Sequence, residues 1–349
     1  MASNDPLHAL IAENIDRLVN LDVSGYGVIA EIHQAAREHY GAPLSWLAAE
    51  RLRAALGEGG TFFVTSGWLM PGFYPYGETD GPIGAAILGR ALSHAFGARM
   101  VVLTETEMVP CTTAACRAAG LNVMTEAEIA AAPRPPHPGN RHCIIVPIPI
   151  PLEAAQSEAK RLFDTYDPKA ILSVEKNGPN AEGLYCMVGG DDNSDCVIKA
   201  AEFFYEAERR GVLTIGIGDR GNEIGFGAVA EVPRRVLPFG EQATDNTTVD
   251  VLVTAAVSNW GASAIAAALA AMLDRPEVMH DTDTESRMLH RCIDAGGIDG
   301  FGCTPIPVTD GMSEPAHIGI CALLNEMIRA PAVKTPSVFA TPLHGTKPR

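Results

Sequence analysis

Two acids stand among glycines in one short stretch of this chain. Residues 216–227 read GIGDRGNEIGFG and follow the apolar, strand-like run 212–215. Glycine lets a ligand approach the backbone closely, while a carboxylate can hold a metal ion or move a proton. The stretch therefore predicts a catalytic site at the end of a strand, with Asp219, Asn222 and Glu223 as its polar side chains.

The same glycines satisfy a nucleotide-binding pattern, but their surroundings do not fit it. Gly216, Gly218 and Gly221 have the spacing G-x-G-x-x-G after a strand, which is the fingerprint of dinucleotide sites. No long helix pattern follows to hold a pyrophosphate at its N-terminus, and the two acids would repel one. We therefore expect no nucleotide cofactor. A metal-dependent phosphatase is also disfavoured, because the D-x-D-like run at 281–285 comes later and follows no apolar strand.

A second group of acids precedes a predicted helix. Glu78 and Asp80 lie in the sequence GETDGPIG. An Asp before Gly-Pro predicts a helix N-cap, which stabilises by about 1 kcal/mol, and Glu78 would complement the helix dipole. In a functional interpretation, the exposed amides of Gly81 and Gly84 bind a substrate carboxylate while Glu78 or Asp80 handles a proton. The two roles are compatible.

Polar residues also follow the predicted strand at 170–174. Glu175 and Lys176 stand where a parallel sheet delivers side chains to a cleft, and Asn180 ends the turn Gly-Pro-Asn. The alternative is an ordinary charged surface turn, since such turns are common. The functional interpretation makes Glu175 catalytic and assigns Lys176 and Asn180 to substrate binding.

Two further polar residues open an Ala-rich helix pattern after the predicted strand at 251–253. Trp260 either forms a wall of the pocket or is a core aromatic residue whose indole N–H finds a partner. Asn259 either donates to the substrate or caps the helix. Both residues are therefore candidates for substrate binding.

The order of predicted elements indicates an α/β protein. Short apolar runs alternate with longer helical patterns, which favours a mainly parallel sheet flanked by helices. The strands are expected at 62–64, 100–103, 143–146, 170–174, 212–217 and 251–253. Residues 1–57 are expected to form an N-terminal helical segment within a single domain, 1–330, with 331–349 as a loosely held tail. The three acidic motifs follow strands, at the edge where open parallel sheets bind ligands.

Composition and charge exclude several classes of function. The 349-residue chain has a formal net charge of -16, so broad binding to nucleic acid or anionic membranes is not expected. The N-terminus shows no secretory signal, and the Ala-rich segment 262–273 is shorter than the ~20 apolar residues that span a bilayer. Eight scattered cysteines make no disulfide or zinc framework. We expect a cytoplasmic protein that binds a small molecule, as a monomer or a homo-oligomer.

Four motifs in this order resemble the C-terminal catalytic-type domain of D-glutamate cyclases. They are ETDGP from Glu78, the run from Glu175 through GPNAEGLY, the stretch 216–227 and VSNWG at 257–261. The resemblance covers residues 20–330. Arg220 stands where the family loop often has another glycine, and Lys176 and Asn177 differ from the more usual residues there.

The resemblance implies cyclodehydration: the α-amine of D-glutamate attacks its own γ-carboxyl carbon, water leaves, and 5-oxo-D-proline forms. The amine must lose a proton, the electrophile needs its charge neutralised, and hydroxide must leave as water. We hypothesise that Glu175 or Glu223 is the base, and that Asp219 with Asn222 positions a divalent cation or the polarised γ-carboxyl group. Mn²⁺ or Mg²⁺, bound by Asp219 and Glu223, suits such hard oxygen ligands.

The other groups of an amino-acid substrate need partners as well. The amides of Gly81 and Gly84 are expected to bind the α-carboxylate, with Lys176 or Arg220 as the charge partner. A related lactam hydrolase would use the same groups to activate water, and a catalytically silent protein would use the cleft to bind a carboxylated metabolite. The convergence of several acids favours the enzyme, because a binding site for anions would prefer Arg and Lys.

Overall fold

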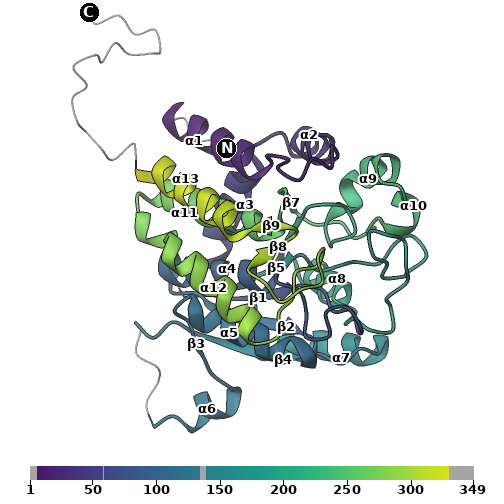
Figure 1. The fold of residues 1–349 in the computed structure, drawn as a ribbon. Helices are drawn as coiled ribbons and strands as arrows, with labels where there is room; N and C mark the ends of the chain where they lie inside the picture. The colour runs from purple at the N-terminus through teal and green to yellow at the C-terminus, as the bar shows by residue number, and fades with distance from the viewer. Residues whose placement is uncertain (1–5, 58, 134–138, 330–349) are drawn as a thin grey trace, which may run out of the picture.

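A seven-stranded parallel sheet runs through the computed structural model, which describes residues 6–57, 59–133 and 139–329 (Figure 1). Its strands are β1 (Thr61–Ser66), β2 (Arg99–Thr104), β3 (Asn122–Val123), β4 (His142–Pro147), β5 (Ala170–Val174), β6 (Leu213–Gly218) and β7 (Val251–Thr254). The strand order is β3-β4-β2-β1-β5-β6-β7, and each neighbouring pair is parallel. The prediction of an α/β protein with a mainly parallel sheet is confirmed. The expected tail, 331–349, lies outside the described residues.

Helices precede the sheet, connect its strands and follow it. The N-terminal ones are α1 (Pro6–Val19), α2 (Ile29–Tyr40) and α3 (Leu44–Leu56), which confirms the helical segment. Those between strands are α4 (Pro82–Phe96), α5 (Val109–Ala118), α6 (Glu126–Ala131), α7 (Leu152–Tyr166), α8 (Ala201–Arg210), α9 (Glu231–Val236) and α10 (Gly240–Ala243). After β7 come α11 (Ser258–Leu273), α12 (Thr282–Asp294), the antiparallel pair β8 (Val308–Thr309) and β9 (Met312–Ser313), and α13 (Glu314–Arg329). The 3-10 turns are η1 (Thr106–Met108), η2 (Phe226–Val229) and η3 (Pro276–Val278).

Alternate side chains of β1 reach the two faces of the sheet. Phe62 and Val64 belong to the larger core, to which α3, α4, α5 and α11 contribute, whereas Phe63 belongs to the core under α7 and α8. Every residue of β1 is buried. A parallel sheet covered on both faces needs such continuous apolar strands, which explains why apolar runs alone predicted strand positions.

The Ala-rich helix α11 lies inside the protein. Its residues 258–271 are all buried, and it contacts α1, α3, α4 and α13. Small side chains let neighbouring helices approach α11 from several sides, so its composition reflects packing. Among the described residues, no helix has both the length and the apolar character that crossing a bilayer requires.

A buried carboxylate ties the first helix to the third. Asp16 of α1 accepts from the backbone N–H of Leu44 at 2.6 Å and of Ser45 at 3.2 Å, and from the Ser45 hydroxyl. These N–H groups open α3, whose own N-cap residue, Pro43, offers no side-chain acceptor. Because α3 packs against α11 and β7, the N-terminal helices share the larger core with the sheet.

The order of the strands reverses at β1, where the sheet offers a binding position. β2 pairs with one side of β1 and β5 with the other. The helix after β1, α4, packs in the larger core, while α8, after β5, packs in the core on the opposite face. Such a switch leaves a crevice outside the carboxyl ends of the strands, where open α/β sheets bind ligands.

Candidate active site

A cavity of about 210 Å³ lies at this switch point, and four separate loops supply its polar groups. Its walls combine aromatic rings with three carboxylates, one guanidinium and one amide. The lining residues are Trp68, Tyr74, Glu78, Glu175, Met187, Val188, Arg220, Asn222, Gly300, Phe301 and Asp310. The structure thus brings together the motifs around Glu78, Glu175 and Arg220, which are far apart in the sequence.

Glu175 follows β5 directly and adopts an unusual backbone conformation. Its φ of 51° is in the left-handed region, which is uncommon for residues other than glycine and often marks a functional position. The Ser258 hydroxyl donates to Glu175 Oε2 at 2.6 Å. Burial raises the pKa of Glu175, and the neighbouring acids Glu223 and Asp80 raise it further. The carboxyl group is therefore held in one orientation beside the cavity.

Asp219 follows β6 and lies behind Arg220, outside the cavity lining. Within the described part of the chain, neither oxygen of its buried carboxylate accepts a hydrogen bond. The Arg220 guanidinium is 3.0 Å from Asp219 Oδ2, which is an ion-pair distance without hydrogen-bond geometry. Burial raises the pKa of Asp219 against the opposing effect of Arg220. Oxygen atoms of Glu175, Asp219 and Glu223 all lie within 4.8 Å of one another, so these residues could hold a cation.

Glu223 closes the glycine-rich loop through backbone hydrogen bonds. Its Oε1 accepts from the N–H groups of Asp219 at 3.4 Å and Arg220 at 3.2 Å, and its Oε2 accepts from Gly221 at 2.8 Å. A side chain at Gly218 would collide with Glu223, since a Cβ there would be 2.9 Å from its Oε2. The glycines of this motif therefore allow a tight loop around a carboxylate.

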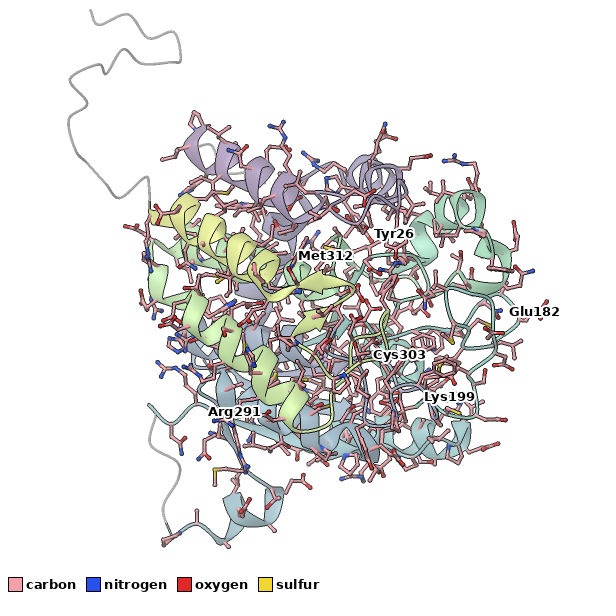
Figure 2. The ribbon with its side chains drawn as sticks, in the orientation of Figure 1. Tyr26, Glu182, Lys199, Arg291, Cys303 and Met312 are labelled. Carbon is pink, nitrogen blue, oxygen red and sulfur yellow. The ribbon has the colours of Figure 1, made fainter. Side chains whose placement is uncertain are left out.

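Arg220 is the single Lys or Arg side chain among the cavity-lining residues. It pairs with Asp219 and, at 3.4 Å, with Asp310. Its guanidinium lies 4.4 Å from the Phe301 ring centre and 5.3 Å from that of Tyr26. Figure 2 labels Tyr26, from the loop before α2, on the same side of the molecule as the loop that carries Phe301. Burial lowers the pKa of Arg220, but its two acidic partners outweigh that effect and raise it.

Two acids complete the cavity, and the sequence reasoning missed one of them. Glu78 is buried, its Oε1 has no hydrogen-bond partner among the described residues, and burial followed by the charge of Asp310 raises its pKa. Asp310 joins β8 to β9 with a φ of 52°. The signal that could have revealed this turn is the Asp-Gly pair at 310–311, a hairpin marker. Ser258 was missed as well, because its contact with Glu175 arises only in the fold.

Asp80 and Asn259 cap each other's helices. Asp80 accepts from the N–H groups of Ser258 at 2.9 Å and Asn259 at 2.8 Å, at the start of α11. Asn259 Oδ1 accepts from Gly84 at 2.6 Å and Gly81 at 3.0 Å, at the start of α4. Asp80 thus caps α11, although the sequence suggested the helix that follows it. The amides of Gly81 and Gly84 are already engaged, so in this arrangement they are not available to a substrate carboxylate.

Three other expected substrate contacts have structural partners away from the cavity lining. Lys176 is fully buried, and its Nζ lies 2.5 Å from Glu105 Oε1 and donates to the Gly67 carbonyl at 3.0 Å. Asn180 donates to the Gln242 carbonyl at 2.8 Å. Trp260 donates its indole N–H to His317 Nδ1 at 2.9 Å, which matches the core interpretation of this residue. Asn222, by contrast, lines the cavity, and its amide is 3.5 Å from the Cys186 carbonyl.

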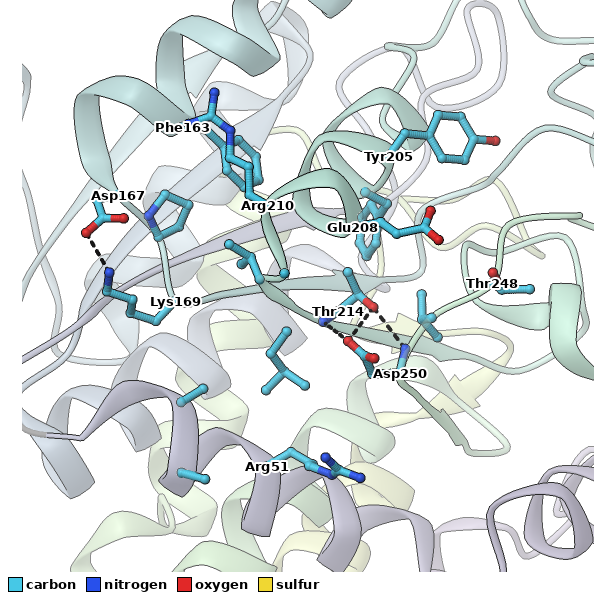
Figure 3. Close-up of a pocket in the computed structure, with 18 residues that line it drawn as sticks. Arg51, Phe163, Asp167, Lys169, Tyr205, Glu208, Arg210, Thr214, Thr248 and Asp250 are labelled. Carbon is cyan, nitrogen blue, oxygen red and sulfur yellow. Dashed lines mark hydrogen bonds and ion pairs between the residues drawn. The ribbon is translucent and has the colours of Figure 1, made fainter.

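A larger cavity, of about 790 Å³, lies at the opposite end of the strands (Figure 3). Lys169 and Asp167 form an ion pair in its wall at 2.5 Å, and Asp250 accepts from the Thr214 hydroxyl at 3.0 Å. Volume alone would favour this cavity as the site. We favour the smaller one, because it lies at the carboxyl ends of the strands and collects the buried acids.

Comparisons with known proteins agree with the motifs that meet at the smaller cavity. Residues 15–325 match the family described as D-glutamate cyclase-like, C-terminal. A similar curated protein is the human mitochondrial D-glutamate cyclase, 33% identical over 121 residues, which cover 34% of this chain. The match spans 20% of that human protein. Because the family match extends across the sheet and every loop of the cavity, the chain belongs to the D-glutamate cyclase-like family.

Proposed function

We propose that this protein cyclises D-glutamate to 5-oxo-D-proline with loss of water. One observation carries the proposal: the buried carboxylates of Glu175, Asp219 and Glu223 cluster within 4.8 Å beside the cation Arg220. Family membership supports the type of reaction. The cavity of about 210 Å³ is smaller than the roughly 300–1,000 Å³ of pockets for drug-sized ligands, which suits a small amino acid.

Proton balance explains why this reaction needs buried carboxyl groups. The substrate ammonium group loses two protons and the departing oxygen gains two, so the reaction consumes no net proton. A carboxylate that takes a proton from the nitrogen can return it to the departing oxygen if both lie within hydrogen-bond reach. A base and an acid in one cavity therefore account for the proton transfers of the reaction.

Glu175 is the proposed base. Ser258 fixes the orientation of its carboxylate, and Glu175 lines the cavity. Burial and the acids Glu223 and Asp80 raise its pKa, which makes the ionised form a stronger base. Glu223, the alternative base, is less suited because backbone N–H groups engage both of its oxygens.

Glu78 is the proposed acid, and Arg220 is the proposed partner of the substrate α-carboxylate. Burial raises the pKa of Glu78, and a carboxyl group that keeps its proton near neutral pH can give it to a departing hydroxide. Arg220 offers a guanidinium that pairs bidentately with carboxylates. Its present partners, Asp219 and Asp310, fix its position at the edge of the cavity.

Mn²⁺ or Mg²⁺ is proposed to bind at Asp219 and Glu223, with Glu175 left for proton transfer. Both ions prefer oxygen ligands, and the two Asp219 oxygens accept no hydrogen bond from the described residues. Such an ion supplies Lewis-acid polarisation of a carboxyl oxygen. We expect a chelator to abolish turnover and added Mn²⁺ or Mg²⁺ to restore it. Unchanged turnover in the chelated protein would remove the ion from the proposal.

The experiment that tests the function is incubation with D-glutamate, with and without Mn²⁺, followed by mass detection of water loss and chiral separation of the product. We expect 5-oxo-D-proline from the wild-type protein and none from Asp219→Asn or Glu175→Gln with the fold retained. Glu182→Gln is the matched control, because this exposed acid lies in the loop that follows Glu175, does not line the cavity and is at the outer edge of the molecule (Figure 2). Absence of water loss from every γ-carboxylated amino acid would contradict the proposal.

The same experiment separates the two alternatives. A lactam hydrolase would open 5-oxo-D-proline to D-glutamate with the same groups, so both compounds are supplied and both directions are followed. A catalytically silent binding protein would show a higher melting temperature with the ligand, while the ligand is recovered unchanged. Either result in place of water loss would replace cyclisation as the function.

A further inference from the structure

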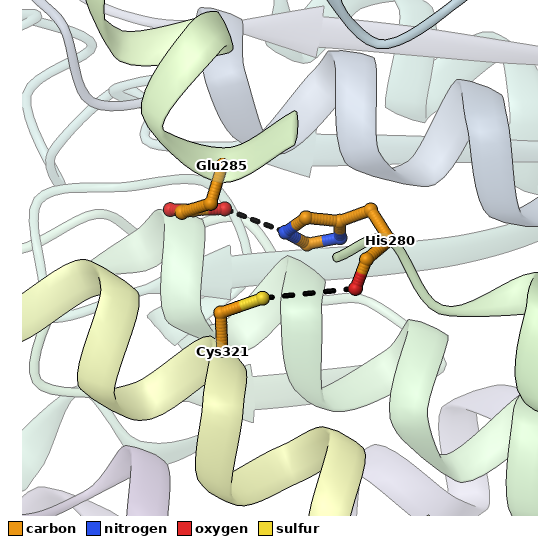
Figure 4. A group of neighbouring side chains, drawn as sticks. All are labelled: His280, Glu285 and Cys321. Carbon is orange, nitrogen blue, oxygen red and sulfur yellow. Dashed lines mark hydrogen bonds and ion pairs between the residues drawn. The ribbon is translucent and has the colours of Figure 1, made fainter. Parts of the chain in front are cut away.

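A second group of possible metal ligands lies away from the cavity, in the C-terminal helices (Figure 4). His280 precedes α12, Glu285 lies in the first turns of α12, and Cys321 is in α13. One ligand atom of each lies within 4.8 Å of the other two, and all three side chains are buried. Because the three come from separate segments, no ligand spacing is visible in the sequence.

The contacts within the group leave its buried polar atoms incompletely satisfied. His280 Nε2 lies 2.6 Å from Glu285 Oε2, and the Cys321 thiol donates to the His280 carbonyl at 3.6 Å. His280 Nδ1 has no hydrogen-bond partner among the described residues. A buried polar atom without a partner is costly, so the group has room for a further interaction that the described side chains do not supply.

We propose that His280, Glu285 and Cys321 bind a Zn²⁺ ion. Imidazole nitrogen, thiolate sulfur and carboxylate oxygen are all zinc ligands, whereas Mg²⁺ and Ca²⁺ do not take sulfur. The charges balance as well, because one thiolate and one carboxylate neutralise a divalent ion. The ion displaces the thiol proton of Cys321 to solvent and binds one ring nitrogen of the neutral His280 imidazole.

A neighbouring amide supports the sulfur ligand. Asn325, one turn after Cys321 in α13, has its Nδ2 3.6 Å from the Cys321 sulfur and donates to the His280 carbonyl at 2.8 Å. The Asn325 amide also donates to the Cys321 carbonyl at 3.0 Å, so its two backbone contacts fix the segments that carry the nitrogen and sulfur ligands. Asn325 therefore holds two of the three ligands in place without binding the ion itself.

The position of the group suggests what the ion does. It joins α12 to α13, and the chain between these helices carries Phe301 and Asp310 into the candidate active site. That connection is also tied to the loop before α4, where the Thr79 hydroxyl donates to the Val308 carbonyl at 3.0 Å. A zinc ion bound by Glu285 and Cys321 would fix α12 against α13, the two helices that this connection joins. The site is thus structural, and none of its three ligands lines the cavity.

The test measures metal content and sulfur coordination in the full chain. The protein is produced in zinc-supplemented medium, dialysed against metal-free buffer and analysed by mass spectrometry for zinc. We expect one equivalent per chain, lost in Cys321→Ser and in His280→Gln and kept in Cys116→Ser, whose thiol is equally buried but outside the group. Asp219→Asn should keep the zinc, which separates this site from the candidate active site.

Cobalt substitution decides the proposal even if the variants fail to fold. Co²⁺ in the wild-type protein should give a sulfur-to-cobalt charge-transfer band, because the proposed ligands include a thiolate and the carboxylate cluster does not. Folded wild-type protein that retains no zinc, or that binds cobalt without this band, would overturn the proposal. Zinc content is measured without turnover, so its outcome does not depend on the proposed reaction.

Discussion

The two ends of the parallel sheet carry very different cavities. At the amino ends of β5 and β6 the cavity measures about 790 Å³, and at the carboxyl ends of the strands it measures about 210 Å³. In the wall of the larger cavity, Lys169 forms an ion pair with Asp167. The smaller one adjoins Glu78 and Asp219, whose buried oxygens include some without a partner among the described residues. Cavity volume favours the amino end of the sheet as the site, whereas the unpartnered carboxylate oxygens favour the carboxyl end.

The difference teaches that an unsatisfied buried acid marks function better than volume does. Leaving a buried polar group without a hydrogen bond costs about 1–3 kcal/mol, and more for a charged group. A chain keeps such groups where they have to meet a ligand, so strongly shifted pKa values gather at functional sites. At the amino end, Asp250 accepts from both the N–H and the hydroxyl of Thr214 and has no comparable deficit.

Glu78→Gln is expected to produce the largest effect at the carboxyl end. The amide fills the same space but cannot donate a proton to the departing oxygen, so kcat should fall about 10²–10⁴-fold. The melting temperature should hold or rise, because an unpartnered buried acid is gone. Turnover is followed with D-glutamate, and thermal unfolding shows that the variant folds. Wild-type kcat in the folded variant would remove Glu78 from the mechanism.

Lys176 provides a second comparison, because it lies at the carboxyl end of the strands but is paired with Glu105. Removing its charge in Lys176→Met leaves Glu105 buried and unpaired, which should lower the free energy of unfolding by about 3–5 kcal/mol. The double variant Lys176→Met with Glu105→Gln should recover most of that loss, since no lone charge remains. Denaturant unfolding measures both. A single variant as stable as the wild type would show that the pair does not support this end of the sheet.

Much of the fold could be predicted from the sequence, because strands and helices have patterns that are visible in short stretches of the chain. Strands buried on both faces read as apolar runs, and helices between them read as longer periodic patterns. The exceptions include β3 and the β8–β9 pair, whose strands have two residues each and are too short for periodicity to detect. The Asp-Gly turn of the β8–β9 pair carries Asp310, so one wall of the cavity was missed with it.

The site was only partly predictable, because contacts between distant segments decide the role of each polar residue. Glu175 and Lys176 are neighbours in sequence, yet Glu175 lines the cavity whereas Lys176 forms a buried ion pair with Glu105. Asp80 and Asn259 look like local caps, but each caps the other's helix. A motif predicts the edge of the sheet at which the polar side chains lie. It does not reveal which oxygen atoms already have a partner.

The pH dependence of stability should reflect the buried acids at the carboxyl end. Burial raises the pKa of Asp245, which lies against Gly178, to about 8, and it raises the pKa of Glu78 as well. The folded state keeps protons that the unfolded chain loses above its ordinary carboxyl pKa of about 4, so the free energy of unfolding falls as pH rises from there to about 8. Melting temperatures measured between about pH 5 and about pH 8 should therefore decline.

Asp245→Asn provides the matched comparison for that decline. The amide does not titrate, so the variant should lose less stability than the wild type between the same two pH values, whatever its absolute melting temperature. Asp250→Asn, at the amino end and away from these buried acids, is the control variant and should leave the slope as it is. Equal slopes in the wild type and Asp245→Asn would show that Asp245 ionises in the folded protein as it does in the unfolded chain.

The smallest expected effect tests the larger cavity directly. Phe163 lines it and packs edge-on against Phe63 of β1, with ring centres 5.1 Å apart. Phe163→Leu enlarges that cavity and removes the aromatic contact, so stability should fall by about 1 kcal/mol. Because the change lies at the amino end, kcat and KM for D-glutamate should stay at wild-type values while the melting temperature falls slightly. A raised KM in this variant would mean that the larger cavity takes part in substrate binding, and the contrast between the two ends would then be reversed.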